Sequence, residues 1–342
     1  MDDQAIRDAV PPVQPPAAAP ETLVPPASTF GKLWPRVFAF IVDGLFVSLC
    51  IVILAIPFFT PLSRLGPWGH LVGFFLTLPY FALLNSRIGN GQTLGKRWMR
   101  LRVVDANGST ITLSRATLRY AVLQAPFFLN GATLPSRFDS FFLDILLAAI
   151  IVGLGGGTLY LIFFNRPSRQ GFHDLAAGTY VVSAESSGPV TPHPVRKYNW
   201  IILGSSCAVI VVGAAFAVHF FTHWGALTSL QQDAAVIETI PGVQSAGVMD
   251  LHQWTNGTLY HILDITVRVQ NPSIARETFA RSAVTTLFQH DPTALQYDQI
   301  RVTIVRGYDL GIAHAQVTRN YSGTPAQWQK HPTTTEPARS IS

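Results

Sequence analysis

The sequence predicts an α-helical integral membrane protein with about five transmembrane helices, followed by a C-terminal α+β soluble domain. Of the 342 residues, 48% are hydrophobic and only 13% are charged, whereas roughly 25% of the residues in an average soluble domain are charged. Long apolar segments recur up to residue 222, and each is close to the roughly 20 residues that cross a bilayer. After residue 222 the composition becomes that of a soluble domain.

Five segments are expected to cross the membrane. Four of them contain few charges, and they cover 36–59, 68–84, 141–164 and 200–222. The remaining segment, 117–134, is interrupted by polar residues and a proline, namely Arg119, Gln124, Pro126 and Asn130. Irregular backbone is tolerated at membrane depth where protein covers it. The sequence therefore leaves two alternatives for this segment, a short tilted span or a re-entrant segment.

Basic residues indicate how the predicted spans are oriented. They are frequent before the first span, after the second and after the fourth, whereas the connections at 60–67 and 131–140 carry one arginine each. Because cytoplasmic connections carry the excess of Lys and Arg, we expect the N-terminus in the cytoplasm and the C-terminal domain outside. We therefore expect a multi-pass protein of the inner, plasma membrane. Its net charge of +5 indicates contact with the anionic inner leaflet rather than with nucleic acid.

Composition divides the chain into six parts. Residues 1–30 are rich in Pro and Ala without an apolar face, which predicts a disordered cytoplasmic tail. The other parts are a four-helix membrane domain at 31–183, a cytoplasmic linker at 184–198, a fifth transmembrane helix at 199–222, an extracytoplasmic α+β domain at 223–321 and a flexible tail at 322–342.

The spacing of apolar residues predicts the order α-β-β-α-β-β for the extracytoplasmic domain. The helices are expected at 226–240 and 274–289, and the strands at 243–251, 259–269, 300–305 and 312–318. Asn256-Gly257, between the first two strands, is a hairpin turn signal. We expect an antiparallel sheet with the helices on one face.

Cofactor-binding patterns are lacking in the sequence. The histidines of the external domain do not have the close spacing of a metal-binding pair; they are His252, His261, His290 and His314. Cys50 and Cys207 lie within predicted spans and do not predict a disulfide framework. We therefore expect neither a metal ion nor another cofactor.

An acidic residue, Asp43, lies within the apolar segment 37–59 of the first span. An ionised carboxylate facing lipid would cost several kcal/mol, so it needs a partner, water or a proton. Arg36 lies two helical turns earlier, on nearly the same face. In one interpretation Asp43 exchanges a proton or cation while Arg36 tunes its charge. In the other, Asp43 accepts hydrogen bonds from neighbouring helices, and Arg36 reaches lipid phosphates.

The connection after the second span is rich in glycine and basic residues between positions 91 and 102. It lacks the glycine-lysine-hydroxyl spacing of a phosphate-binding loop, and it does not lie between a strand and a helix. We therefore expect a basic loop at the inner leaflet, formed by Lys96, Arg97, Arg100 and Arg102.

His173 and Asp174 are adjacent, as in a carboxylate-oriented imidazole that could act as a general base. No motif ties a nucleophile to this pair, so enzymatic activity is not expected. We expect instead that Asp174 forms a structural ion pair with Arg36 or with a loop arginine.

Three blocks of the membrane domain resemble the RDD family of membrane proteins, which is named for an arginine and two aspartates. The blocks are Arg36-Val-Phe-Ala-Phe-Ile-Val-Asp43, Gly91-Gln-Thr-Leu-Gly-Lys-Arg97 with Leu101-Arg-Val-Val-Asp105, and Arg169-Gln-Gly-Phe-His-Asp-Leu-Ala-Ala-Gly-Thr179. The resemblance covers about 31–183 and implies that Arg36, Asp43 and Asp174 are the residues of the family name. The family is largely uncharacterised, and transport is suggested for some members.

Two functions are compatible with these observations. The first is transport of an ion or small solute by a polar cluster of Arg36, Asp43, His173 and Asp174. The second is a scaffold or sensor whose extracytoplasmic domain binds a protein partner while the helices anchor it. Polar residues are sparse along the other spans, so a homo-oligomer could complete a path that one chain cannot form.

Overall fold

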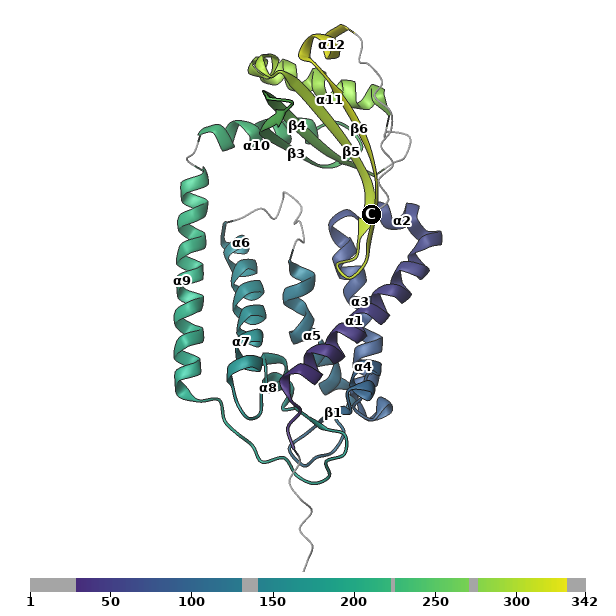
Figure 1. The fold of residues 1–342 in the computed structure, drawn as a ribbon, viewed down its shortest axis with the longest axis vertical. Helices are drawn as coiled ribbons and strands as arrows, with labels where there is room; N and C mark the ends of the chain where they lie inside the picture. Colours follow the sequence, from purple (N-terminus) through teal and green to yellow (C-terminus); the bar gives the residue numbers. More distant parts are fainter. Residues whose placement is uncertain (1–28, 131–140, 223–224, 271–275, 331–342) are drawn as a thin grey trace, which may run out of the picture.

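The computed structural model describes residues 29–130, 141–222, 225–270 and 276–330. The chain forms a helical part with a two-stranded sheet and a larger four-stranded sheet. Figure 1 shows the larger sheet, with its helices, at the end of the helical part opposite β1. The long helix α9 connects the two ends of the molecule. This arrangement separates a membrane domain from a C-terminal sheet domain, as the sequence predicts.

Ten of the helical segments among the described residues form the body of the helical part. They are α1 (Leu33–Ala55), η2 (Ile56–Phe58), α2 (Phe59–Ser63), η3 (Gly66–Trp68), α3 (Gly69–Asn85), α5 (Leu113–Leu129), α6 (Phe141–Ala148), the π-helix η6 (Ala149–Gly156), α7 (Gly157–Phe164) and α9 (Lys197–Thr222).

Three helices of the described chain are long and apolar enough to cross a membrane, and they cover Leu33–Ser63, Ile145–Phe164 and Lys197–Ala217. The second predicted span corresponds to the shorter apolar helix α3. The predicted segment 117–134, a short tilted span or a re-entrant segment, corresponds to α5. This helix has the lowest mean hydropathy of these long helices. Helices able to span a membrane are thus confirmed, whereas the number five stays a prediction.

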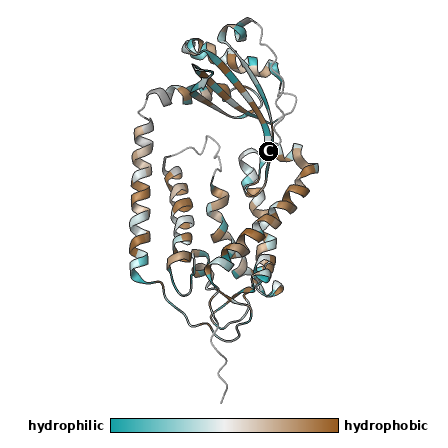
Figure 2. Cartoon of the chain, viewed as in Figure 1, coloured by the Kyte–Doolittle hydropathy of each residue, from teal (hydrophilic) through white to brown (hydrophobic). Residues whose placement is uncertain are grey.

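Helix α1 buries one narrow stripe and exposes the rest of its apolar surface. The buried residues recur every fourth position, at Ala39, Asp43, Val47, Ile51 and Ala55. Large apolar side chains on its other faces are exposed. Figure 2 colours much of the neighbouring helices as hydrophobic too. A helix with one face packed on protein and the others apolar is suited to a lipid surrounding.

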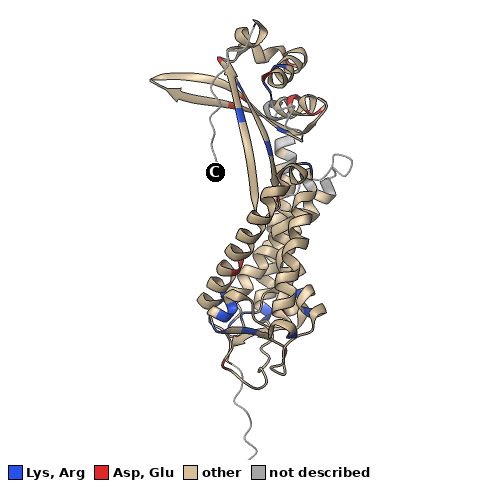
Figure 3. Ribbon diagram, turned by 90° about the vertical axis from the view of Figure 1, so that its right-hand side faces the viewer, with Lys and Arg blue, Asp and Glu red and all other residues tan. Residues whose placement is uncertain are grey.

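The end of the membrane domain opposite the larger sheet is closed by short elements. They are η4 (Arg87–Gly89), α4 (Leu94–Trp98), β1 (Leu101–Val104), α8 (Phe172–Ala177) and β2 (Tyr180–Ser183). Strands β1 and β2 pair antiparallel. The sequence pattern did not predict this small sheet. Figure 3 shows Lys and Arg gathered at this end of the helices.

The sheet domain has the predicted order of helices and strands, with two short helices added. Its elements are α10 (Gly225–Glu238), β3 (Val243–Thr255), β4 (Thr258–Val269), α11 (Glu277–His290), η7 (Pro292–Gln296), β5 (Gln299–Asp309), β6 (His314–Gly323) and α12 (Pro325–Lys330). At the predicted turn, Asn256 and Gly257 both have positive φ, 50° and 83°, as a two-residue hairpin turn requires.

The predicted antiparallel sheet is wrong in one pairing. The strand order is β3-β4-β5-β6, and β4 pairs with β5 in parallel, whereas the other two pairs are antiparallel. The reason is that α11 carries the chain from β4 back to the start of β5. A crossover through a helix gives a parallel pair, while a tight hairpin gives an antiparallel one.

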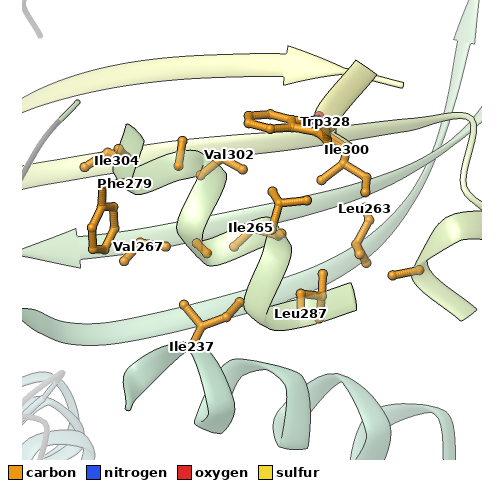
Figure 4. Packing of buried hydrophobic residues seen from close by; sticks show 14 of the residues in the cluster. Ile237, Leu263, Ile265, Val267, Phe279, Leu287, Ile300, Val302, Ile304 and Trp328 are labelled. Carbon is orange, nitrogen blue, oxygen red and sulfur yellow. The ribbon is translucent and has the colours of Figure 1, made fainter. Parts of the chain in front are cut away.

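One apolar core joins the sheet to its helices, as Figure 4 shows. Ile237 of α10, Leu287 of α11 and Ile265 of β4 are fully buried in it. Trp328 of α12 is only 3% exposed, and its indole Nε1 donates to the carbonyl oxygen of Ile300 at 3.1 Å. The predicted flexible tail at 322–342 is therefore wrong at its start, because residues up to 330 belong to the fold; residues 331–342 lie outside the described chain.

The hairpin of β5 and β6 extends from the sheet domain to the membrane helices (Figure 1). Leu310, near its tip, is fully buried in a cluster with Val47 of α1 and Phe81 of α3. The hydroxyl of Ser48 donates to the carbonyl oxygen of Ile312 at 2.9 Å. A Cβ at Gly73 of α3 would lie 1.8 Å from the carbonyl oxygen of Leu310. The two domains are therefore joined by close packing as well as by α9.

Candidate functional site

Asp43 is 1% exposed and accepts three hydrogen bonds. Its Oδ1 accepts from the Tyr80 hydroxyl at 2.7 Å and from the backbone N–H of Gly95 at 2.8 Å. Its Oδ2 accepts from the Thr93 hydroxyl at 2.5 Å. A Cβ at Gly95 would lie 2.1 Å from the carbonyl oxygen of Ala39, so glycine allows α4 to approach α1. The carboxylate thus fixes the start of α4 against α1. This agrees with the interpretation in which Asp43 accepts hydrogen bonds from neighbouring helices.

Arg36 connects α1 to the chain around α8. Its Nη1 donates to the carbonyl oxygen of Arg169 at 2.8 Å, and its Nη2 donates to those of Ser168 at 3.1 Å and Val181 at 2.8 Å. The guanidinium is directed into the protein, rather than toward the lipid phosphates expected in one interpretation. Its Nε is buried without a hydrogen-bond partner in the described chain.

Asp174 forms its ion pair with a residue of the least regular predicted span. Arg119 of α5 approaches it with Nε 2.8 Å from Oδ1, and the Thr179 hydroxyl donates to the same oxygen at 2.8 Å. His173 Nε2 lies 3.3 Å from Oδ2. Burial favours the neutral acid, yet Arg119 and His173 hold the pKa of the Asp174 carboxyl well below its usual range. A structural ion pair forms as predicted, but with Arg119 instead of Arg36 or a loop arginine.

Lys96 points in a different direction from the other residues of the predicted basic loop. Its ammonium turns inward and donates to Oδ1 of Asn85 at 2.6 Å. In the described chain no carboxylate lies within ion-pair distance of it. Burial, followed by repulsion from Arg119, lowers the pKa of Lys96 to about 7. Lys96 is therefore a half-buried donor to Asn85 whose pKa is lowered toward neutral pH.

The other three basic residues of the loop lie nearer the surface. Arg97 is exposed. Arg100 forms a surface ion pair with Glu185 at 3.1 Å, with both side chains more than 70% exposed, and Arg102 donates to the carbonyl oxygen of Ser186 at 2.5 Å. Of these four basic residues, Lys96 alone lines the cavity described next.

These polar groups meet in one cavity of about 370 Å³ near the β1–β2 end of the membrane domain. Its polar lining consists of Arg36, Asp43, Asn85, Lys96, Arg119, Thr158, His173 and Asp174. Most of the remaining lining is apolar, and it includes Phe40, Leu159 and Phe163, which are exposed on the outside of the helices. The cavity therefore reaches from a buried polar cluster to the lipid-facing surface.

A family match covers every residue that lines this cavity except Val181. Residues 30–178 match the model of the RDD family. The membrane domain belongs to the RDD family. Neither a curated protein nor a solved structure matches the chain. The resemblance read from the sequence is confirmed, and the three residues of the RDD name, Arg36, Asp43 and Asp174, all line one cavity.

The RDD cavity is lined by more basic than acidic side chains. Three basic side chains line it, Arg36, Lys96 and Arg119, against two carboxylates. Both carboxylates already accept hydrogen bonds from protein groups. Besides the Nε of Arg36, the hydroxyl of Thr158 and the Nδ1 of His173 are buried without a partner in the described chain. Such a site can receive a small anionic group with an apolar part against the remaining walls.

Four features of the site were not predicted from the sequence: the roles of Tyr80, Thr93 and Arg119, and the inward direction of Lys96. Arg119 carried a usable signal, because a cation inside an apolar segment requires an acidic partner. Tyr80 and Thr93 are ordinary residues of a helix and a loop, and their role depends on the packing of α4 on α1.

Proposed function

We propose that the RDD domain binds a small amphiphilic anion in its cavity and transports it across the membrane. The observation that carries this proposal is the excess of basic groups around an apolar cavity, where both carboxylates are already hydrogen-bonded. An anion would pair with Lys96 and the free donors, while its apolar part would lie along the exposed mouth of the cavity. In this proposal Asp43 holds the site together, and Lys96 takes the role of the charge-carrying residue.

Proton transfer at Lys96 supplies a means of coupling. With a pKa near 7, its Nζ gains a proton when an anion arrives and loses it when the anion leaves, because a neighbouring negative charge stabilises the ammonium form. One proton and one anionic group then move together, so the bound pair is close to neutral. This lowers the cost of placing charge at membrane depth.

The proposed topology has five spans, a cytoplasmic N-terminus and an extracytoplasmic sheet domain in the plasma membrane. Its support is the gathering of basic residues at the β1–β2 end and the course of α9 from that end to the sheet domain. The basic end then faces the anionic inner leaflet.

One observation also favours the second function, binding of an extracytoplasmic partner. Strand β3 lies at the edge of its sheet, and the β3–β4 hairpin exposes large apolar side chains. They are Met249, Trp254, Leu259 and Tyr260. An exposed sheet edge with apolar residues is a surface on which another chain can pair.

The transport proposal is tested with the purified full-length chain in proteoliposomes. Octanesulfonate is a suitable probe because it stays anionic at neutral pH, and octyltrimethylammonium is its cationic counterpart. We expect uptake of the sulfonate alone. Lys96→Met should abolish this uptake, whereas Arg97→Met, its exposed neighbour, should leave it unchanged.

Two outcomes would contradict the proposal. The first is sulfonate uptake equal to that of empty liposomes. The second is a sodium- or potassium-driven proton flux that disappears in Asp43→Asn and persists in Lys96→Met. That result would mean that Asp43, rather than Lys96, carries the transported proton or cation.

A further inference from the structure

Two histidines face each other on the β3–β4 hairpin of the sheet domain. His252 and His261 are cross-strand partners, each four residues from the nearer end of the Asn256-Gly257 turn. Their rings stack with centroids 4.5 Å apart. The antiparallel register therefore brings together two imidazoles that are nine positions apart in the sequence.

A carboxylate completes the group. Asp250 lies two residues before His252, so both side chains project from the same face of β3. Its Oδ1 is 2.7 Å from Nε2 of His261 and 3.8 Å from Nδ1 of His252. One nitrogen of each histidine and one oxygen of Asp250 all lie within 4.8 Å of one another.

Neighbouring groups hold this arrangement in place. The Tyr297 hydroxyl donates to the other oxygen of Asp250 at 3.2 Å, and its ring lies 4.3 Å from that of His261. The backbone N–H of His261 donates to Oδ2 of Asp298 at 2.8 Å. Groups that orient the ligands from outside are typical of metal sites. A hydrogen bond between His261 and Asp250 alone would not require a second imidazole stacked at the same carboxylate.

We propose that Asp250, His252 and His261 bind a divalent transition-metal ion. Imidazole nitrogen with carboxylate oxygen suits Zn²⁺, Co²⁺, Ni²⁺ or Cu²⁺ better than Mg²⁺ or Ca²⁺. For ligand distances of about 2.0–2.2 Å, the three ligand atoms, which already lie within 4.8 Å of one another, would converge on the ion. Three protein ligands leave a position for water or for a group from a partner. The site is on the surface, with His252 60% and Asp250 36% exposed, so a metal ion reaches it directly.

The test uses the full-length chain without an affinity tag, in detergent micelles and treated with a chelator. Zn²⁺ binding is measured by calorimetry, and Co²⁺ is added separately to record its visible spectrum. We expect one Zn²⁺ per chain and a Co²⁺ spectrum typical of low coordination number. His252→Ala and His261→Ala should each weaken Zn²⁺ binding at least tenfold, and Tyr297→Phe should weaken it less.

Matched controls separate this site from other histidines. His290→Ala and His314→Ala change histidines elsewhere in the same domain and should leave binding unchanged. Circular dichroism of each variant shows whether the sheet is intact. Zn²⁺ binding that is absent in the wild type, or equal in wild type and in the His252→Ala/His261→Ala double variant, would overturn the proposal.

Discussion

At the scale of single residues, Asp43 is best described as an acceptor that joins separate segments. Asp43→Asn keeps one oxygen for Tyr80 and Gly95, and its amide can donate to the Thr93 hydroxyl. Asp43→Ala leaves these donors without an acceptor, and each unsatisfied buried group costs about 1–3 kcal/mol. We expect thermal unfolding in detergent to show Asp43→Ala as clearly less stable than Asp43→Asn. Equal losses would mean that the charge, rather than the hydrogen bonds, stabilises this contact.

Lys96 gives the cavity a dependence on pH. Its folded-state pKa of about 7 lies below the usual 10.5, so the cavity loses a positive charge as pH rises through 7. Arg36 and Arg119 disfavour the ammonium, whereas Asp43 and Asp174 favour it. Between pH 6 and 8 we expect octanesulfonate affinity, measured by calorimetry, to fall about tenfold, because the protonated fraction falls by about that factor. Lys96→Arg should remove the pH dependence; if it persists, another group titrates.

The polar residues of the site were predictable to different degrees. Arg36, Asp43 and Asp174 stand out because a charge within or beside an apolar segment must be compensated. Lys96 could not be predicted as a site residue, because a lysine in a basic loop is ordinarily solvated. The direction of its side chain depends on where α4 packs. His252 and His261 could have been paired from the sequence, because they are symmetric about a recognised hairpin turn.

At the scale of elements, the contact of α4 with α1 depends on one glycine. A Cβ at Gly95 would lie 2.1 Å from the carbonyl oxygen of Ala39, whereas a Cβ at Gly44 of α1 would meet nothing within 4 Å. Gly95→Ala should therefore move α4 and cost about 1–3 kcal/mol, with a lower Tm and weaker anion binding. Gly44→Ala is the matched control and should leave both unchanged. If Gly95→Ala leaves both the Tm and anion binding unchanged, the close contact of α4 with α1 is not needed for stability or for binding.

Local patterns predicted most elements, and long-range packing explains the exceptions. The Asn256-Gly257 turn and the helix α11 are encoded in neighbouring residues. The parallel pairing of β4 with β5 is not, because alternation along a strand is the same in either direction. The helix α12 was missed since its main apolar residue, Trp328, is buried by strands and helices far away in the sequence.

At the scale of the whole molecule, the β5–β6 hairpin links the sheet domain to the RDD domain. His70 of α3 lies 3.3 Å from Asp309 of this hairpin, and Arg306 of β5 lies over the ring of Phe59 at 4.9 Å. The sequence of the hairpin did not predict its contact with the membrane helices, because the apolar residues at its tip have the pattern of an ordinary strand. A partner or metal ion bound to the sheet domain would therefore act on a unit that is packed against α1 and α3.

The arrangement of these two domains predicts where each end of the molecule lies in a cell. Arg97 of α4 and Thr258 of β4 are both exposed and lie at opposite ends of the helices. In a chain from which Cys50 and Cys207 have been removed, we expect a membrane-impermeant maleimide to label Thr258→Cys in intact cells. Arg97→Cys should react only after the cells are opened. The reverse pattern would invert the orientation and place the basic β1–β2 end outside, against the rule that cytoplasmic connections are positive. Labelling of both in intact cells would mean that the chain inserts in two orientations, and directional transport by the RDD cavity would then be lost.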